Sequence, residues 1–456
     1  MSEMKVRGTM DDGDDRSDGM NREDVIMLCC SDISGQLRGK GFPASALEAR
    51  TEKGVGWTPT NVMITAHGPI ADSPWGPFGD LLLHPDLATK VHVLFGDEAA
   101  AEHFVLGDIR HLDGRPWECC LRDFLRRGLA ALAAESGLQI KGAFEHEFHY
   151  DGAEPRPGSG YTLAAFRRQG IFAEVLLHAL RAANLKPDTF MPEYGPCQYE
   201  ITIGPDKGLT IADHAIVLRE LTRAAAAHLG HQASFTPIVD PAAVGNGLHV
   251  HFSLLDGDGR PVNHDPAAPE GISRQAGAFL AGVQAKLPAL CALTAASTVS
   301  YLRLNPHRWS AAYNNLARQD REAALRICPV FETIGLPIKD QLHFEYRAAD
   351  AAASPYLVLG AIVWAGVWGL RQGLKTPALT DRDPTTLDAA ELQELGIERL
   401  PQSLDAALDI LAADDDLKTA MGPVLHDAYL RHKRFECGLL KDLSPEEQCA
   451  RYRQIY

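Results

Sequence analysis

Four short segments of the chain alternate apolar residues with residues that carry charge or bind metals. Side chains on a β-strand point to opposite faces with a period of two, so each segment predicts a strand with one apolar and one chemical face. One strand of this kind suits an ordinary solvent-facing sheet, whereas four together favour a shared cavity. The chemical faces are Glu145, Glu147 and His149 in 143–150; Gln198, Glu200 and Thr202 in 198–203; His249, His251 and Ser253 in 247–254; and Gln341, His343, Glu345 and Arg347 in 341–347.

The residue types on these faces indicate a metal-dependent chemistry. The faces hold Glu, His and Arg and almost no Lys, unlike a water-facing sheet. Carboxylates gathered in a cavity repel one another, so they must be protonated or hold cations. Oxygen ligands with an occasional imidazole suit Mg²⁺ or Mn²⁺, and zinc is not expected because the sequence has no thiolate cluster. Nearby arginines suit phosphate or carboxylate, and together these features favour phosphoryl transfer.

Charge and cysteine content narrow the class of protein. The 456 residues carry a formal net charge of −16, which argues against nucleic acid or an anionic membrane as the main partner. The nine cysteines lack paired spacing and indicate reduced thiols in a cytoplasm. Neither a run of about 18 apolar residues nor the apolar core of a signal peptide is present.

The chain divides into three parts by composition. Residues 1–22 form an acidic tail that we expect to be disordered. Residues 23–114 contain short strand-like segments broken by Gly and Pro, which indicates a small β-rich domain. Residues 115–456 mix strands with helical patterns, so the predicted fold class is α+β. The helical patterns cover 118–137, 162–184, 210–230, 272–297 and 400–422.

Five motifs occur in an order that resembles the glutamine synthetase family. The resemblance runs from about Asp32 to the helix after Tyr356. FEHEF resembles the family's Glu-x-Glu strand, and EYGPCQYE its pair of glutamates seven or eight residues apart. GNGLHVHFSL resembles its Gly-rich His-x-His strand, DREAALRI its phosphate segment, and FEYRAADAAASPY its Glu-x-Arg strand and following helix.

This resemblance implies a fold, an assembly and a set of site residues. It implies an N-terminal β-grasp domain, and a catalytic domain whose curved antiparallel sheet forms half a barrel. It also implies a homo-oligomer of two stacked hexameric rings, with each site completed by a neighbour, and ATP with two or three Mg²⁺ or Mn²⁺ ions. The implied roles are Glu147, Glu193 and Glu200 for one ion; Glu145, His249 and Glu345 for another; Arg303 for the amino-acid carboxylate; Arg321 and Arg326 for the phosphates; Arg347 for the transferred group; and His251 and Ser253 for ATP.

The sequence departs from ammonia-using members of the family at the amine side. In RLNPHRWS, residues 303–310, Trp309 stands where those enzymes carry a glutamate that helps bind ammonium. Their Asp-Gly-Ser-Ser turn is also missing, and the nearest match is GVGWTPTN, with Trp57. Losing both carboxylates removes the negative pocket for NH₄⁺, and an aromatic lining favours an organic amine, with an apolar or aromatic one preferred. A packing role for Trp309 is the alternative.

Smaller departures affect the other contacts. The Asn-Gly-Ser-Gly of the family is shortened to a segment beginning at Gly245, which leaves the backbone contact to the amino acid open. His343 replaces a basic residue two positions before the Glu-x-Arg glutamate, and the tyrosine that some bacterial members modify is absent. His307 and Arg308 have no predicted role.

The sequence therefore predicts an ATP-dependent ligase that joins the γ-carboxylate of glutamate to an organic amine. The reaction would pass through a γ-glutamyl phosphate, since a carboxylate is a poor electrophile until it is phosphorylated. An ammonia-using glutamine synthetase is the first alternative. A catalytically silent structural or regulatory relative is the second, although such a chain has no physical need for six metal ligands.

Overall fold

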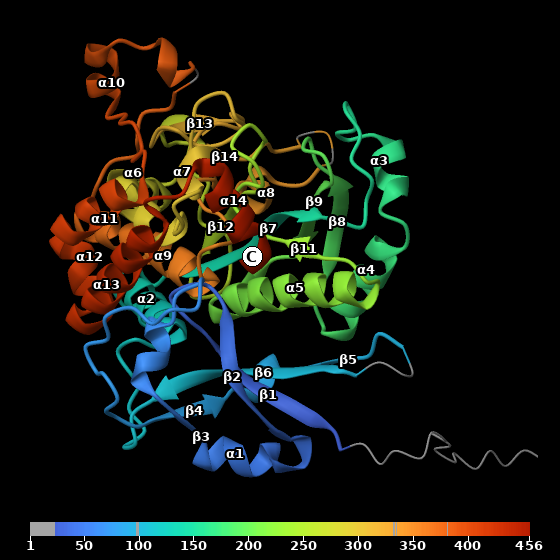
Figure 1. The fold of residues 1–456 in the computed structure, drawn as a ribbon. Helices are drawn as coiled ribbons and strands as arrows, with labels where there is room; N and C mark the ends of the chain where they lie inside the picture. Colours follow the sequence, from blue (N-terminus) through green and yellow to red (C-terminus); the bar gives the residue numbers. More distant parts are fainter. Residues whose placement is uncertain (1–22, 97–99, 332, 334, 381) are drawn as a thin grey trace, which may run out of the picture.

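The computed structural model describes residues 23–96, 100–331, 333, 335–380 and 382–456 (Figure 1). The tail predicted at 1–22 lies outside the described residues. Within the described part, strands form a six-stranded N-terminal sheet and a nine-stranded catalytic sheet. Figure 1 shows the N-terminal sheet, in blue, on one side of helix α5 (Leu209–His228), and the catalytic sheet on the other.

The N-terminal sheet has the strand order β2-β1-β6-β4-β3, with β5 beside β6. Strands β1 and β6 are parallel, and the other pairs are antiparallel. The short helix α1 (Leu47–Lys53) follows β2. The strands are β1 (Val25–Ser31), β2 (Leu37–Pro43), β3 (Val55–Trp57), β4 (Leu81–Pro85), β5 (Val91–Val93) and β6 (Glu102–Arg110).

The catalytic sheet has the order β13-β14-β15-β12-β7-β9-β8, and β10 and β11 pair with β7. Every pair is antiparallel except β13 with β14, so the sheet departs from the expected antiparallel pattern only at one end. The α+β class predicted from the sequence is confirmed. The strands are β7 (Gln139–Tyr150), β8 (Pro187–Pro192), β9 (Gln198–Ile203), β10 (Asp206–Lys207), β11 (Ala233–Ser234), β12 (Leu248–Leu255), β13 (Leu316–Arg318), β14 (Leu325–Ile327) and β15 (Phe344–Tyr346).

The apolar face of β7 packs into the core. Tyr150 stacks on Phe172 with ring centroids 4.1 Å apart, and Phe148 lies 5.3 Å from Phe235. His146 shares this face, edge-on to Phe235, and burial lowers its pKa to about 3. His146 is therefore a neutral core side chain, and the candidate functional residues of β7 lie on the opposite face.

Helices cover the core face, and in the described part of the chain the regular elements after β15 are all helices. Ser273 caps α6 by accepting a hydrogen bond from the backbone N–H of Ala276. By length and composition α6 could cross a membrane, but 78% of its most apolar stretch is buried inside the protein, as in a core helix. The helices not yet named are α2 (Leu121–Ser136), α3 (Leu163–Arg168), α4 (Phe172–Ala182), α6 (Arg274–Thr294), α7 (Ser300–Arg303), α8 (Ile338–Gln341), α9 (Pro355–Arg371), α10 (Ala389–Leu395), α11 (Leu404–Ala413), α12 (Asp415–Met421), α13 (Pro423–Leu440) and α14 (Pro445–Ile455).

Two segments differ from the sequence prediction. The helical pattern at 162–184 is split into α3 and α4, because Gly170 takes a φ of +65° that a helix interior does not allow. The fourth chemical strand is shorter than expected, because Gln341 ends helix α8. Its amide bonds the backbone of Phe331 and Leu336, so it does not join the chemical face.

Candidate active site

The register of the catalytic sheet brings the predicted ligands together. His249 lies opposite Glu145 between β12 and β7, and Glu147 lies opposite Glu200 between β7 and β9. On the other side of β12, His251 pairs with Glu345 of β15. Residues two apart on each strand face the same way, so these side chains share one surface of the sheet.

Glu147, Glu193 and Glu200 form the first acid cluster. Their ligand oxygens all lie within 4.8 Å of one another. Glu193 follows β8, where it accepts a hydrogen bond of 3.0 Å from the Tyr161 hydroxyl. Burial and the neighbouring carboxylates raise the pKa of Glu200 to about 10, and they raise the pKa of Glu193 as well. An all-oxygen cluster under such repulsion fits a hard divalent cation.

A second cluster lies around Glu145 and Glu345. These carboxylates and His251 place ligand atoms within 4.8 Å of one another. His249 lies between the two clusters: its Nδ1 is 2.6 Å from Glu145 and its Nε2 is 3.8 Å from Glu147. Glu145, His249 and Glu345, the predicted ligands of the second ion, therefore lie together, with His249 3.7 Å from Glu345. His251, which the resemblance assigns to ATP, is a further neighbour of this cluster.

Two arginines hold Glu345 in its charged form. Arg326 donates to it at 2.8 Å, and Arg347 donates to its other oxygen. Burial alone would raise the pKa of Glu345, but Arg347 and the nearby imidazoles lower it to about 2. Arg347 also donates to the carbonyl of Arg321 at 2.9 Å, which ties the Glu-x-Arg strand to the phosphate segment.

Arg303 is buried beside a glycine segment. It donates to the carbonyls of Ala349 at 3.0 Å and of Arg347 at 3.2 Å. A Cβ at Gly245 would lie 2.6 Å from the Arg303 side chain, so only glycine allows this approach. The backbone N–H of Gly247 donates to Glu147 at 2.8 Å, so the shortened segment contacts both the arginine and the first cluster.

These groups open onto one cavity of about 270 Å³. Most predicted residues line it, whereas His251, Ser253, Arg326 and Glu345 do not. The sequence did not predict Tyr161, Met191, Tyr194, Val244 and Arg308 as site residues. Met191 lies on β8, and the other four lie on loops with no alternating pattern. The lining is Glu145, Glu147, Tyr161, Met191, Glu193, Tyr194, Glu200, Val244, Gly245, His249, Arg303, Arg308, Trp309, Arg321 and Arg347.

Trp57 does not reach this cavity. It lies on β3 opposite Leu81, its side chain is 6% exposed, and it belongs to the core of the N-terminal sheet. The role of Trp57 as an amine contact stays a prediction, because the family resemblance assigns the N-terminal domain to the site of a neighbouring subunit. Ser253 pairs with Lys141 further along the sheet and is half-buried.

Trp309 stands at the cavity on a loop with an unusual backbone. It is 57% exposed, and both His307 and Trp309 have φ values near +60°, at 59° and 55°. Their backbone N–H groups both donate to the carboxylate of Glu322, at 3.0 and 2.9 Å. Arg308 donates to the carbonyls of Pro241 and Ala243. These bonds give Arg308 a structural role that the sequence did not predict. The loop is held from two sides.

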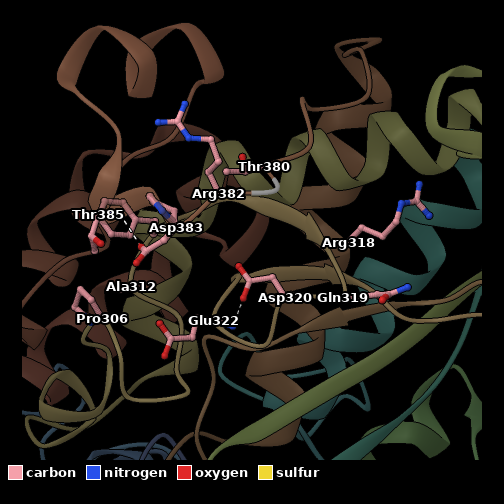
Figure 2. A pocket seen from close by; sticks show the side chains of 12 residues that line it. Pro306, Ala312, Arg318, Gln319, Asp320, Glu322, Thr380, Arg382, Asp383 and Thr385 are labelled. Carbon is pink, nitrogen blue, oxygen red and sulfur yellow. Dashed lines mark hydrogen bonds between the residues drawn. The ribbon is translucent and has the colours of Figure 1, made fainter.

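A second cavity, of about 500 Å³, lies beside the same loop (Figure 2). Pro306 and Glu322 line it from the loop side, and Asp383 lines it from the segment after α9. His307, the other residue without a predicted role, contacts Asp383 at 2.9 Å through its Nε2. This contact ties the Trp309 loop to the C-terminal segment.

Two family models match this chain: the glutamine synthetase catalytic domain over residues 118–452, and the glutamine synthetase N-terminal domain over residues 18–117. The chain belongs to the glutamine synthetase family. The prediction of family membership is confirmed, and so is the prediction of a glutamate–amine ligase. The family uses ATP and divalent metals and is generally oligomeric.

Individual relatives of the glutamine synthetase family match nearly the whole chain. A gamma-glutamylpolyamine synthetase of Streptomyces coelicolor is 34% identical over 444 residues, covering 94% of this chain and 93% of the relative. A glutamine synthetase of Thermococcus kodakarensis is 29% identical, covering 88% and 86%. A solved structure described as a novel glutamine synthase homolog has a TM-score of 0.87 and 39% identity, covering 96% of this chain and 99% of that one.

Proposed function

We propose that this ligase joins the γ-carboxylate of L-glutamate to an organic amine at the expense of ATP. The observation that carries the proposal is Trp309, which brings an indole rather than a carboxylate to a cavity that also holds Arg303 and the acid clusters. An indole cannot take a proton from NH₄⁺ and attracts it less than a carboxylate does, whereas its large apolar face suits an alkyl or aryl group or an organic cation.

The site residues are proposed to act in three groups. Arg303 binds the α-carboxylate of glutamate, Arg321 and Arg326 bind phosphate, and Arg347 holds the transferred group. His251 and Ser253 contact ATP, and the backbone at Gly245 contacts the amino acid. Two or three Mg²⁺ or Mn²⁺ ions would offset phosphate charge when bound. The metal ligands are Glu147, Glu193 and Glu200 in one site, and Glu145, His249 and Glu345 in the other.

The reaction needs an acyl phosphate that the amine attacks before water can hydrolyse it. Arg303 is fixed by two backbone carbonyls, so it can orient glutamate without moving. Arg321 and Arg347 face the same cavity, where their charges offset those of the phosphates. The Trp309 loop then lies where it can exclude water from the acyl phosphate.

The lining indicates which amines are accepted. Tyr161, Met191 and Tyr194 join Trp309 in the cavity, which favours an amine with an apolar or aromatic portion. The name of the Streptomyces coelicolor relative, gamma-glutamylpolyamine synthetase, supports an aliphatic chain over an aromatic ring. Ammonium remains the competing acceptor.

The proposed working form is a cytoplasmic homo-oligomer of two hexameric rings. Members of the family are generally oligomeric, which supports assembly of this chain. The nine free cysteines, eight of them buried, suit a reducing compartment. Sedimentation of the purified protein would give the number of subunits.

One assay tests the proposed function. Purified protein is incubated with Mg-ATP and glutamate, and phosphate release is measured with ammonium, alkylamines, polyamines and anilines in turn. The proposal expects rapid release with an organic amine and little with ammonium. Saturation at low ammonium with inert organic amines would establish an ammonia-using enzyme. Release with none of them would identify a silent relative.

A further inference from the structure

Cys328, His251 and His343 meet beside the second acid cluster. His251 lies on β12, Cys328 directly follows β14, and His343 directly precedes β15, so three neighbouring strands supply the group. One ligand atom from each lies within 4.8 Å of the other two. Cys328 is buried, whereas the two histidines are half-buried.

The separation of the thiol from one imidazole matches a tetrahedral metal site. The Cys328 Sγ lies 3.7 Å from His251 Nδ1 and 3.8 Å from an oxygen of Glu345. With Zn–S near 2.3 Å and Zn–N near 2.0 Å, ligand atoms at a tetrahedral angle stand about 3.6 Å apart. Little movement is therefore needed for an ion to sit between the thiol and the imidazoles.

The orientation of His343 suits a metal ligand. Its Nδ1 lies 2.8 Å from the carbonyl oxygen of Gln341, which can only accept a hydrogen bond, so Nδ1 carries the proton. In the neutral ring the other nitrogen, Nε2, then carries the lone pair that a metal ion would take. Imidazoles that bind metals are commonly held this way, with the second ring nitrogen bonded to a carbonyl or a carboxylate.

The donor set differs in kind from the two acid clusters. A thiolate with two imidazoles prefers a borderline-soft ion such as Zn²⁺, whereas carboxylates prefer Mg²⁺ or Mn²⁺. Binding would release the proton of the Cys328 thiol, because the thiolate is the ligand. The sequence has no cluster of cysteines, but the fold combines one cysteine with two histidines that are distant in the sequence.

We propose that Cys328, His251 and His343 form a zinc-type metal site, and that an ion bound there inhibits the ligase. Inhibition follows because His251 is shared: it contacts Glu145 and Glu345 at 3.6 and 3.8 Å, and the proposed function gives it to ATP. An ion held by the Cys328 thiolate and by Nδ1 of His251 would fix this ring, whose Nε2 faces the two carboxylates, and would keep it from turning to ATP. The inhibition rests on the proposed function, whereas metal binding does not.

Cobalt titration tests the site without any activity. Co²⁺ is added to the reduced, chelator-treated protein, and the near-ultraviolet charge-transfer band of a cobalt–thiolate bond is recorded. The wild type should show this band, Zn²⁺ should abolish it by displacement, and Cys328→Ser should lack it. Cys197→Ser is the matched control, since Cys197 is the more exposed thiol and should leave the band unchanged.

A second variant and an inhibition assay complete the test. His343→Gln keeps the thiol but should bind Co²⁺ at least about tenfold more weakly. Even the loss of a residue that only supports a metal ligand lowers metal affinity by this factor. In the phosphate-release assay at saturating Mg²⁺, Zn²⁺ should inhibit the wild type at least about tenfold more strongly than Cys328→Ser. A band that persists in Cys328→Ser, or no band in the wild type, would overturn the site. Binding without a difference in inhibition would overturn only the inhibitory role.

Discussion

At the scale of single residues, Trp309 links amine choice to the phosphate segment. Its backbone is held by Glu322, which directly follows Arg321, a residue of the cavity. A left-handed conformation at a tryptophan is costly and persists only where the surroundings fix it, as the two hydrogen bonds to Glu322 do here. The indole is therefore placed by the loop rather than by chance packing.

Replacing this indole tests its role in amine selection. Trp309→Glu should raise the ratio of kcat/KM for ammonium to that for butylamine by about tenfold, because butylamine loses about 1.4 kcal/mol of apolar contact with the indole, whereas the new carboxylate attracts both cations. Steady-state phosphate release supplies both constants. Trp309→Phe keeps an aromatic face and should leave the ratio near the wild-type value. An unchanged ratio in Trp309→Glu would assign Trp309 to loop packing.

How far the sequence predicts the site depends on the origin of each contact. Glu145, Glu147 and His249 follow from the alternation of side chains on a strand, a local property that survives folding. Cys328 and His343 come together only because β14 pairs with β15, and no spacing in the sequence encodes that pairing. The burial of Trp57 could not be predicted either, since a motif match does not reveal which aromatic ring packs into the core.

At the scale of elements, helices α6 and α9 cross closely in the core. A Cβ at Gly282 would lie 2.2 Å from the carbonyl oxygen of Ala365, and one at Gly369 would lie 2.2 Å from that of Ala278. The two helices thus approach backbone to backbone, and side chains at these positions would force them apart.

An alanine at this crossing should destabilise the fold. Gly282→Ala should lower the free energy of unfolding by about 2 kcal/mol, since the gain in helix propensity is smaller than the cost of overpacking. Gly438→Ala is the matched control: it lies inside α13 with open space around its Cβ position, and it should raise stability by up to about 1 kcal/mol. Urea unfolding measures both. Equal effects of the two variants would contradict the close crossing.

Local signals in the sequence predicted some element boundaries and missed others. The pattern at 118–137 becomes α2, ending before Gly137 in the left-handed conformation, because apolar spacing and a terminal glycine are both local signals. The start of β15 could not be predicted in this way. Residues 341–347 alternate throughout, yet tertiary hydrogen bonds draw Gln341 into α8.

At the scale of the whole molecule, the C-terminal helices bind the N-terminal unit through buried polar contacts. His432 of α13 is fully buried, and its Nε2 donates to the carbonyl of Ile64 at 3.2 Å. The hydroxyl of Tyr456 donates to the carbonyl of Ser34 at 2.7 Å. The C-terminal segment and the N-terminal unit therefore stabilise each other.

The burial of His432 predicts a loss of stability in mild acid. Burial and the nearby Lys433 lower its pKa to about 4, below an ordinary value near 6.5, so the folded protein resists protonation. This stabilisation is complete above pH 6.5 and is lost as the pH falls towards 4. Between pH 7 and pH 5 the wild type should lose about 2 kcal/mol more unfolding free energy than His432→Gln, measured in urea. Parallel losses in the two proteins would show that His432 does not titrate on unfolding.

The central claim concerns the acceptor, and a competition experiment tests it most directly. The protein, Mg-ATP and glutamate are incubated with ammonium and a panel of primary organic amines at equal concentrations, and the products are separated by mass. We predict that a γ-glutamyl amide of an organic amine forms well before glutamine does. Glutamine as the main product of the mixture would contradict the account.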